Sequence, residues 1–259
     1  MVNTKKYSTG FTLIELMVAM TMGLFMSLTM VGYFADSLKS AAVLRSEKQI
    51  GESAQRVLSV ISDAVHEAGS GNPALSDVPF YVGNCGGWDP CTDDGSANAS
   101  DRIAVLVYPE NRRSCGNTAT AAGEQIANVY FIDLDSGVNT LFCRGYSLQS
   151  LAWLEARVAL VHGVENLQIL YRVNDASAGT SSYLSADNVP SVDGVQELGW
   201  DRVRAADIHV LISNGLGNTT PDTPASQSFK LADTDTQVFT DGVLRKAFST
   251  QSLIFSKME

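Results

Sequence analysis

The sequence predicts an α+β protein, in which a long N-terminal helix packs on a head domain built around an antiparallel β-sheet. Residues 11–68 hold no proline, and they are apolar at first and amphipathic later. After Pro73 the sequence changes to short β-like runs separated by Gly, Asn, Asp, Ser and Pro. A helical stretch followed by a series of strands is typical of the α+β class. We expect one head domain plus the helix.

The helix begins with a stretch that can cross a membrane. Residues 11–34 contain 24 residues with one charge, that of Glu15. A bilayer core needs about 20 apolar residues in helical form. Lys5 and Lys6 precede the stretch, and positive residues stay on the cytoplasmic side. The sequence therefore predicts a cytoplasmic N-terminus and a translocated segment from residue 35 onward.

Glu15 and Gly10 separate this stretch from two common kinds of membrane segment. A cleaved secretory signal has an apolar region of about 7–15 residues with a small-residue cleavage site after it. Here the apolar run is longer, and Gly10 lies before it. A plain anchor would not need Glu15, because an ionisable side chain in a bilayer is costly. The helix dipole makes a carboxylate tolerable at this end but does not explain Gly10.

The helix is expected to continue as an amphipathic segment to about residue 69. Apolar residues recur at spacings of three and four, as at Val57, Ile61, Ala64 and Val65, and the charged residues fall mostly elsewhere. The segment 69–73 (GSGNP) is a strong stop signal. A continuous helix from residue 11 to 68 would be roughly 85 Å long. Two helices broken near Asp36 are the alternative.

The head is expected to begin at residue 70. We expect extended segments at 80–82, 103–108, 129–134, 140–146, 167–173, 208–212 and 247–255, and an extended run from Arg157 onward. Two long polar segments, 84–100 and 214–235, are expected to be exposed loops.

Four cysteines lie in the middle of the chain: Cys85, Cys91, Cys115 and Cys143. An even number in a translocated domain favours two disulfides, for which three connectivities exist. We expect nearest neighbours to pair, Cys85 with Cys91 and Cys115 with Cys143. Trp88 lies in the loop that a bond between Cys85 and Cys91 would close. We expect its ring to pack against the head rather than to serve as an exposed binding aromatic.

The chemistry of the chain favours a protein that is not an enzyme. The sequence lacks the G-x-S-x-G, H-E-x-x-H and phosphate-loop motifs, and its three histidines are scattered. The net charge of −10 argues against nucleic-acid binding through phosphates. We expect no cofactor or metal. A loop with clustered carboxylates is the one candidate for calcium, although its spacing departs from the EF-hand pattern; it contains Asp89, Asp93, Asp94 and Asp101.

The start of the chain resembles the type IV prepilins and the type II secretion pseudopilins. Residues 10–16 read GFTLIEL, which is the signature of these families. The resemblance implies that a prepilin peptidase cuts after Gly10 and that the new terminal amine of Phe11 is methylated. It also implies that Glu15 neutralises the terminal amine of a neighbouring subunit in a filament. The residues then divide into a leader (1–10), a membrane and assembly segment (11–34), an amphipathic segment (35–69) and the head (70–259).

Later segments resemble the PilW type of minor pilin. The run 163–171 (GVENLQILY) is similar to a strand of that family, and segments 200–208 and 245–250 follow in the expected order. The resemblance implies a minor pilin that primes pilus assembly with other minor pilins and the major pilin, through the inner-membrane assembly machinery. The head would be periplasmic before assembly, and the subunit would then lie near the tip of an extracellular pilus.

Two other functions stay open at this point. One is the J-type minor pseudopilin of a type II secretion system, which shares the helix, the head and the mechanism. The other is a membrane-anchored periplasmic enzyme, for which the head would need a cleft with perturbed titratable groups. The closing residues 257–259 (KME) differ from the arginine–asparagine ending usual in the PilW type, so no role is assigned to them.

Overall fold

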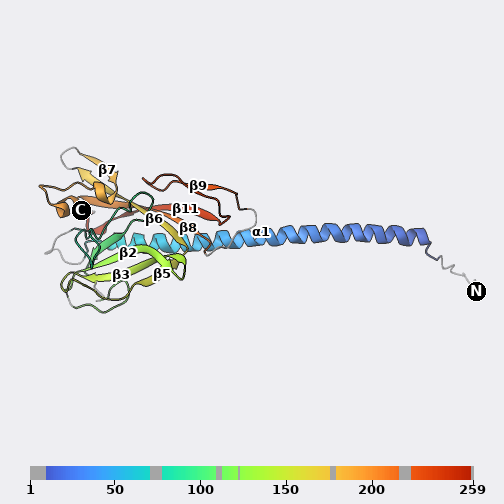
Figure 1. Ribbon diagram of the computed structural model, residues 1–259, viewed down its shortest axis with the longest axis horizontal. Coiled ribbons are helices and arrows are strands. Elements are labelled where there is room, and N and C mark those ends of the chain that lie inside the picture. Colours follow the sequence, from blue (N-terminus) through green and yellow to red (C-terminus); the bar gives the residue numbers. More distant parts are fainter. Residues whose placement is uncertain are drawn as a thin grey trace, which may run out of the picture. The chain divides into compact units, whose positions relative to one another are not determined.

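The structure is a computed structural model that describes residues 10–70, 78–108, 113–121, 123–175, 179–215 and 223–257. The expected leader, apart from Gly10, lies outside the described residues. The chain divides into two compact units, residues 1–45 and 46–259. The helix α1 (Leu13–Glu67) contributes to both units (Figure 1).

Helix α1 confirms the predicted long helix, and it runs through Asp36 without a break. It ends where the sequence places its stop signal, because Gly69 adopts a positive φ of 70°. Glycine takes this left-handed conformation without the steric cost that other residues pay, which suits the position after a helix. The amide of Ser70 bonds back to the carbonyl of Glu67 and so satisfies one of the last carbonyls of the helix.

Two antiparallel sheets make up most of the head. The first contains β1 (Ile103–Val107), β2 (Ile126–Asp135), β3 (Val138–Ser147), β4 (Ala152–Trp153) and β5 (Val158–His162). Its order is β1-β2-β3-β4, and β5 also pairs with β3. The second contains β6 (Val164–Asp175), β7 (Thr180–Leu184), β8 (Val203–Ser213) and β11 (Arg245–Leu253), in the order β11-β8-β6-β7.

Shorter elements complete the head. A two-stranded hairpin pairs β9 (Gln227–Phe229) with β10 (Gln237–Phe239). A short helix, α2 (Gln196–Trp200), and two 3₁₀ turns, Ala186–Asn188 and Phe255–Lys257, lie between or after the strands. The predicted fold class, a long helix packed on an antiparallel head, is therefore confirmed.

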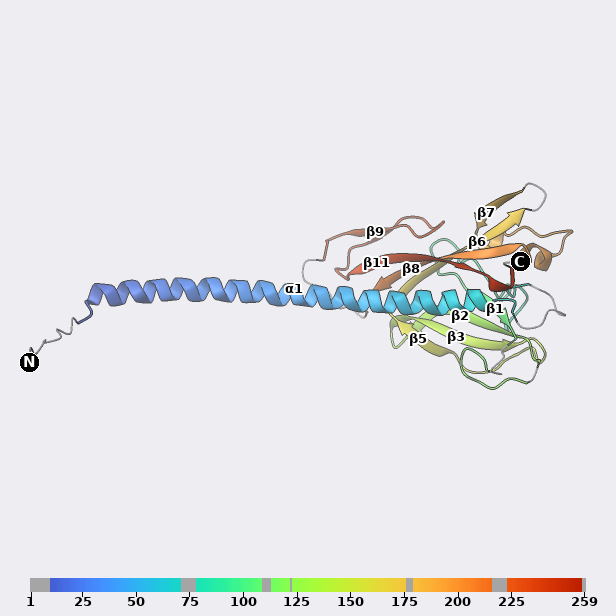
Figure 2. The same ribbon diagram turned by 180° about the vertical axis from the view of Figure 1, so that it is seen from behind.

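The core of the head forms where the second part of α1 meets the sheets. The buried helix residues recur every three or four positions: Ile50, Ala54, Val57, Ile61 and Val65. This spacing places them on one face, as the amphipathic pattern predicts. Strands of the two sheets run along opposite sides of this part of α1 (Figure 2). The face of the helix and the sheets thus enclose one hydrophobic core.

Two sequence predictions about the head need correction. The expected strand 80–82 forms only an isolated bridge, between Phe80 and Val105. The run does not continue as a strand, because the carbonyl of Tyr81 accepts from the amide of Thr92, just after the disulfide-bonded Cys91, rather than from a strand residue. The polar segments 84–100 and 214–235 are also not plain exposed loops. The first buries Cys91 and Thr92, and the second contains β9.

Candidate functional site: helix start and head

The first turn of α1 holds Glu15 in a capping box. The backbone amide and the hydroxyl of Thr12 each donate to Oε2 of Glu15 at 3.1 Å. In return, the amide of Glu15 donates to Oγ1 of Thr12 at 3.3 Å. Thr12 precedes the first helical residue and Glu15 is the third, so the two satisfy helix amides that have no partner within the helix. The carboxylate is thereby fixed at the N-terminal end of α1.

The other oxygen of Glu15 is left available. Oε1 makes no hydrogen bond within the part of the chain that the structure describes. Phe11, which would carry the new amine after cleavage at Gly10, is 86% exposed. A carboxylate with one committed and one open oxygen can cap its own helix and still accept from a cation of another chain.

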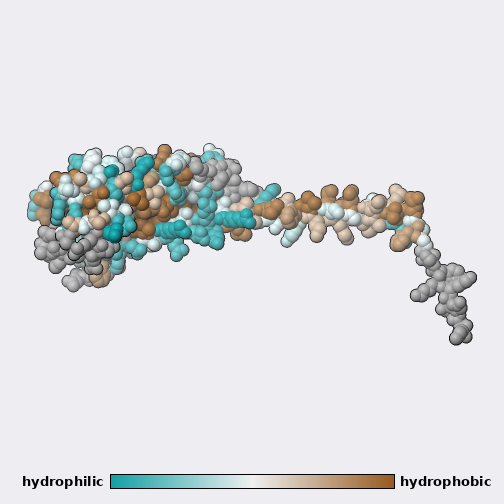
Figure 3. Space-filling model, turned by 90° about the horizontal axis from the view of Figure 1, so that it is seen from below, coloured by the Kyte–Doolittle hydropathy of each residue, from teal (hydrophilic) through white to brown (hydrophobic). Residues whose placement is uncertain are grey.

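The residues after Glu15 form an apolar surface around the whole helix. From Leu13 to Phe34 every large hydrophobic side chain is at least 47% exposed. The space-filling view shows these residues along the N-terminal part of α1 (Figure 3). The helix is long and apolar enough to cross a membrane. In water this surface would be strongly unfavourable, so it requires lipid or other apolar helices around it.

Both disulfides join the pairs expected from nearest-neighbour pairing. Cys85 bonds to Cys91 with the Cα atoms 5.5 Å apart, and Cys115 bonds to Cys143 with the Cα atoms 6.2 Å apart. The first bridge closes a short loop around Trp88. The second fixes the segment after residue 113 to the middle of β3.

Trp88 packs against the first sheet, as predicted. Its ring meets Phe131 and Trp153 edge to face, with centroids 4.8 and 5.2 Å away. The guanidinium of Arg102 lies 4.7 Å from the centre of the same ring. These contacts give the tryptophan a structural role in holding the disulfide loop on the sheet.

Two carboxylates of the acidic loop, the candidate for calcium, are engaged in contacts within the chain. Asp93 pairs with Arg102 at 3.4 Å. Asp101 is buried, and its two oxygens accept from the backbone amides of Gly95 and Ile169. Among the described residues, no group of three or more His, Cys, Asp or Glu side chains is placed to hold a metal ion.

Among the described carboxyl groups of the head, that of Asp101 has the most strongly shifted pKa. Burial raises its pKa to about 8, although the amides of Gly95 and Ile169 act in the opposite direction. The negative charges of Asp94 and Asp233 raise its pKa further. The residue joins the acidic loop to β6 and lies under the surface, so we read it as a structural group.

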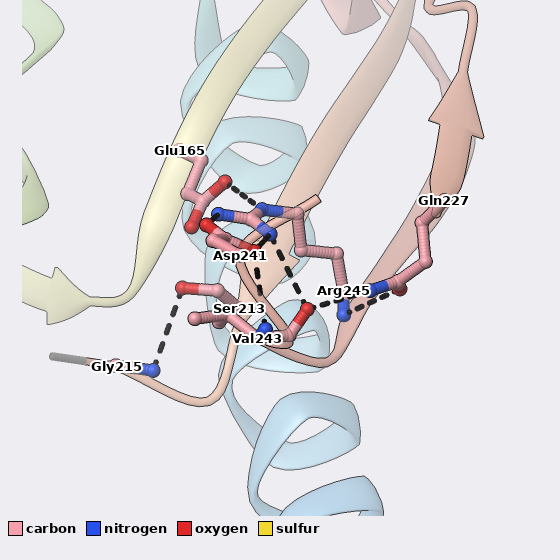
Figure 4. A network of polar contacts seen from close by, with 7 residues as sticks. All are labelled: Glu165, Ser213, Gly215, Gln227, Asp241, Val243 and Arg245. Carbon is pink, nitrogen blue, oxygen red and sulfur yellow. Dashed lines mark hydrogen bonds and ion pairs between the residues drawn. The ribbon is translucent and has the colours of Figure 1, made fainter. Parts of the chain in front are cut away.

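A charge network at the start of β11 was not predicted from the sequence. Arg245 is 7% exposed and donates to Oε2 of Glu165 on β6. It also holds both oxygens of Asp241, at 2.7 and 2.6 Å (Figure 4). Its guanidinium lies 4.0 Å from the ring centre of Phe239. Hydrogen bonds from Arg245 lower the pKa of Asp241 to about 2. Only the arginine within the family-like run 245–250 hinted at this position, and its partners come from distant segments.

Comparison with known families gives two matches. The family described as Type IV Pilus-assembly protein W matches residues 129–253, which run from β2 to β11. The Prokaryotic N-terminal methylation motif matches residues 5–31, which contain Gly10, Phe11 and the capping box. Among curated proteins no significantly similar sequence is found.

The two matches coincide with the two structural parts described above. The methylation motif covers most of the exposed apolar start of α1, and the assembly-protein domain covers the second sheet and the first sheet apart from β1 and the start of β2. Pilins are generally not enzymes. With its PilW domain, its N-terminal methylation motif and its long helix on an antiparallel head, the chain is a PilW-type pilin.

Proposed function

We propose that this chain is a minor pilin that primes the assembly of a type IV pilus at the inner membrane and is carried near the filament tip. In this proposal prepilin peptidase cuts after Gly10, Phe11 becomes the methylated N-terminus, and the head is periplasmic until assembly. The observation that carries the proposal is the exposed apolar start of α1, capped by Thr12 and Glu15 and joined in one chain to a PilW domain.

The proposed assembly step moves the start of α1 from lipid into a bundle with the helices of other subunits. Both surroundings are apolar, so the hydrophobic surface stays covered throughout. The terminal ammonium of Phe11 opposes this transfer, because an unpaired charge in a low-dielectric interior costs several kcal/mol. The open oxygen of Glu15 on a neighbouring subunit can accept from that ammonium and offset the cost.

The capping box makes two roles of Glu15 separable. One role is local, since the side chain caps the helix, which contributes about 1 kcal/mol. The other is the proposed charge pair with a neighbour. A glutamine can reach the same amide of Thr12 but carries no charge. Glu15→Gln therefore retains the cap and removes the pair, whereas Thr12→Val removes the hydroxyl side of the cap and retains the charge.

The test compares Glu15→Gln, Glu15→Ala and Thr12→Val in cells that make pili. Each variant is scored for cleavage, by N-terminal sequencing of the mature protein, and for incorporation, as its amount in sheared filaments. We expect all three to be cleaved before Phe11. Both Glu15 variants should be incorporated at least about tenfold less, because about 1.4 kcal/mol corresponds to a factor of ten. Thr12→Val should be incorporated nearly as wild type.

Two results would contradict the proposal. Wild-type incorporation of Glu15→Gln would show that incorporation does not need the charge pair. A mature N-terminus other than Phe11 would show that cleavage does not occur after Gly10. If Thr12→Val were as defective as Glu15→Gln, incorporation would require the helix cap in addition to the charge pair.

The J-type pseudopilin of type II secretion is the other assembly subunit with the same N-terminal motif. The match of residues 129–253 to a family described as a pilus-assembly protein favours the pilus. Deleting the gene separates the two: we expect loss of surface pili and twitching with normal protein secretion. Loss of secretion with normal pili would assign the chain to a secretion pseudopilus instead.

A further inference from the structure

Strand β11 is an edge strand whose outer side is open along its middle. Among the described strands of the second sheet it pairs only with β8. The ladder is flanked by a bond from Asn214 to Leu244 and one from Ile254 to Arg204. Hydrogen-bonded pairs alternate in an antiparallel ladder. The even-numbered residues of β11 therefore bond to β8, and the odd-numbered ones direct their amides and carbonyls away from it.

The outward groups are partnered at the two ends of β11 and open between them. At one end the amide of Arg245 donates to the side chain of Gln227, at 3.2 Å. At the other end the carbonyl of Leu253 contacts Nδ1 of His66, at 3.2 Å. Ala247, Ser249 and Gln251 are exposed, and within the described residues their outward backbone groups make no hydrogen bond. The open stretch is five residues long, 247–251.

A groove lies beside this open stretch. It has a volume of about 470 Å³ and is lined by uncharged residues of α1 and β11, among them Gly51, Ala54, Leu58, Ser62, Phe248 and Ser249. The ion pair between Lys246 and Glu47, at 2.8 Å, lies toward one end. The hydrogen bond from Ser252 to the carbonyl of Ser62 lies toward the other. The groove is thus bounded along the same length as the open edge.

We propose that an extended segment of a neighbouring pilin subunit adds to β11 as a fifth strand of the second sheet. Its backbone bonds to residues 247–251, and its inward side chains, small or apolar at alternate positions, enter the groove. This contact would give the head its own binding site for a neighbouring subunit, and it rests on the assembly role proposed above. Strand addition supplies affinity through main-chain bonds and specificity through pockets for alternate side chains.

The lengths of the two sides of the groove, α1 and β11, fit an added strand. The helix wall runs from Gly51 to Ser62, which spans roughly 17 Å at the helical rise. Five residues of an extended strand also span roughly 17 Å. An added helix would leave the outward amides and carbonyls of β11 without partners. The chemistry of the open backbone therefore selects a strand.

Two substitutions close the site without disturbing the fold. Gly51→Leu fills the groove, since a Cβ at Gly51 would meet no atom within 4 Å and leucine is a better helix former. Ser249→Pro removes the outward amide alone and leaves the bonds to β8 in place; proline is tolerated at such an edge position. Gly51→Ala and Ser249→Ala are the matched controls, because they keep the groove and the amide.

The experiment measures incorporation of the full chain into sheared filaments. Gly51→Leu fills the groove, and the proline ring of Ser249→Pro replaces an outward amide in the middle of the open edge, so neither variant lets the added strand seat. Losing two or three of its backbone bonds predicts about a tenfold or larger drop for both variants. Both alanine controls should be incorporated as wild type. Thermal unfolding in detergent should give unchanged or higher midpoints for all four. Thr250→Pro, which removes a bond to β8, should lower the midpoint and so verifies the register.

A photocrosslinking residue at Ser249 identifies the occupant, with Asn117 on an exposed turn as the control position. We expect a crosslink from position 249 to an extended segment of a pilin subunit, lost in the Gly51→Leu background. Crosslinking to a helix of a pilin, or to no pilin, would overturn the proposal. Wild-type incorporation of both Gly51→Leu and Ser249→Pro, with Glu15→Gln defective, would also overturn it. If Glu15→Gln is also incorporated normally, it is the proposed function that fails.

Discussion

The surroundings of Asp101 act on its pKa in opposite directions. Two backbone amides favour its ionised form, but burial disfavours that form more strongly, and burial raises the pKa of Asp101 to about 8. An ordinary aspartate in the unfolded chain has a pKa of about 3.9. The folded state therefore holds a proton that the unfolded state releases.

The direction of the resulting pH dependence follows from this difference. A carboxyl whose pKa is raised on folding contributes its full stability below about pH 4 and loses it as the pH rises through about 8. We expect the free energy of unfolding of the chain in detergent to fall between these pH values. Asp101→Asn should be less stable at low pH, because its amide faces one backbone donor, but should show a flatter profile. An equally steep profile in Asp101→Asn would assign the dependence to another group.

Residue-level prediction from sequence succeeded where the signal is local. The pairing of Cys85 with Cys91 lies within a few residues of chain, and the packing of Trp88 follows from that loop. The burial of Asp101 depends instead on the amide of Ile169, which is 68 positions away in the sequence. A spacing pattern carries no information about such a contact, so Asp101 was expected only as a candidate calcium ligand.

At the scale of elements, the strongly periodic segments were predicted and the weakly patterned ones were not. The alternation of apolar and polar residues and the high apolar content predicted β2, β3 and β8 as strands. Strand β7 reads TSSYL, is exposed over four of its five residues and forms because β6 offers an edge. Strands β9 and β10 likewise depend on tertiary contacts, among them the bonds from Gln227 to the start of β11.

Arg245 is the main electrostatic tie between these elements. It joins β11 to Glu165 on β6 and to Asp241, and its stacking on Phe239 links it to β10. Burial lowers the pKa of Arg245, but the hydrogen bonds with Asp241 and Glu165 outweigh this and raise it. The cation is therefore firmly held, and Glu165 depends on it for a partner.

Removing that cation should be costly. Arg245→Ala leaves the carboxylate of Glu165, whose side chain is 15% exposed, without its countercharge. Breaking a buried pair in this way costs about 3–5 kcal/mol, with the exposed Asp241 contributing little. We expect Arg245→Met combined with Glu165→Gln to recover most of the loss. Denaturant unfolding of both variants checks this, and a loss below about 1 kcal/mol in Arg245→Ala would show that the network is not stabilising.

The whole molecule separates its apolar and its charged surface along the chain. The exposed apolar residues concentrate at the start of α1, and the acidic residues lie after residue 34, apart from Glu15. Cleavage after Gly10 would remove Lys5 and Lys6 and leave 16 basic and 28 acidic side chains, a net charge of −12. In the proposed topology the two lysines stay on the cytoplasmic side before cleavage and so orient the chain in the membrane.

The disulfides offer a direct readout of that orientation. They form in the periplasm and not in the reducing cytosol, so all four cysteines of a correctly inserted chain resist alkylation until they are reduced. Replacing Lys5 and Lys6 by glutamate removes the positive charge on the cytoplasmic side. We expect a fraction of these chains to keep the head in the cytosol, with Cys85, Cys91, Cys115 and Cys143 open to a thiol reagent added at cell lysis. Replacement by arginine is the matched control and should leave the thiols protected. Complete protection in the glutamate variant would mean that the apolar segment or the assembly machinery, rather than the two lysines, orients the chain.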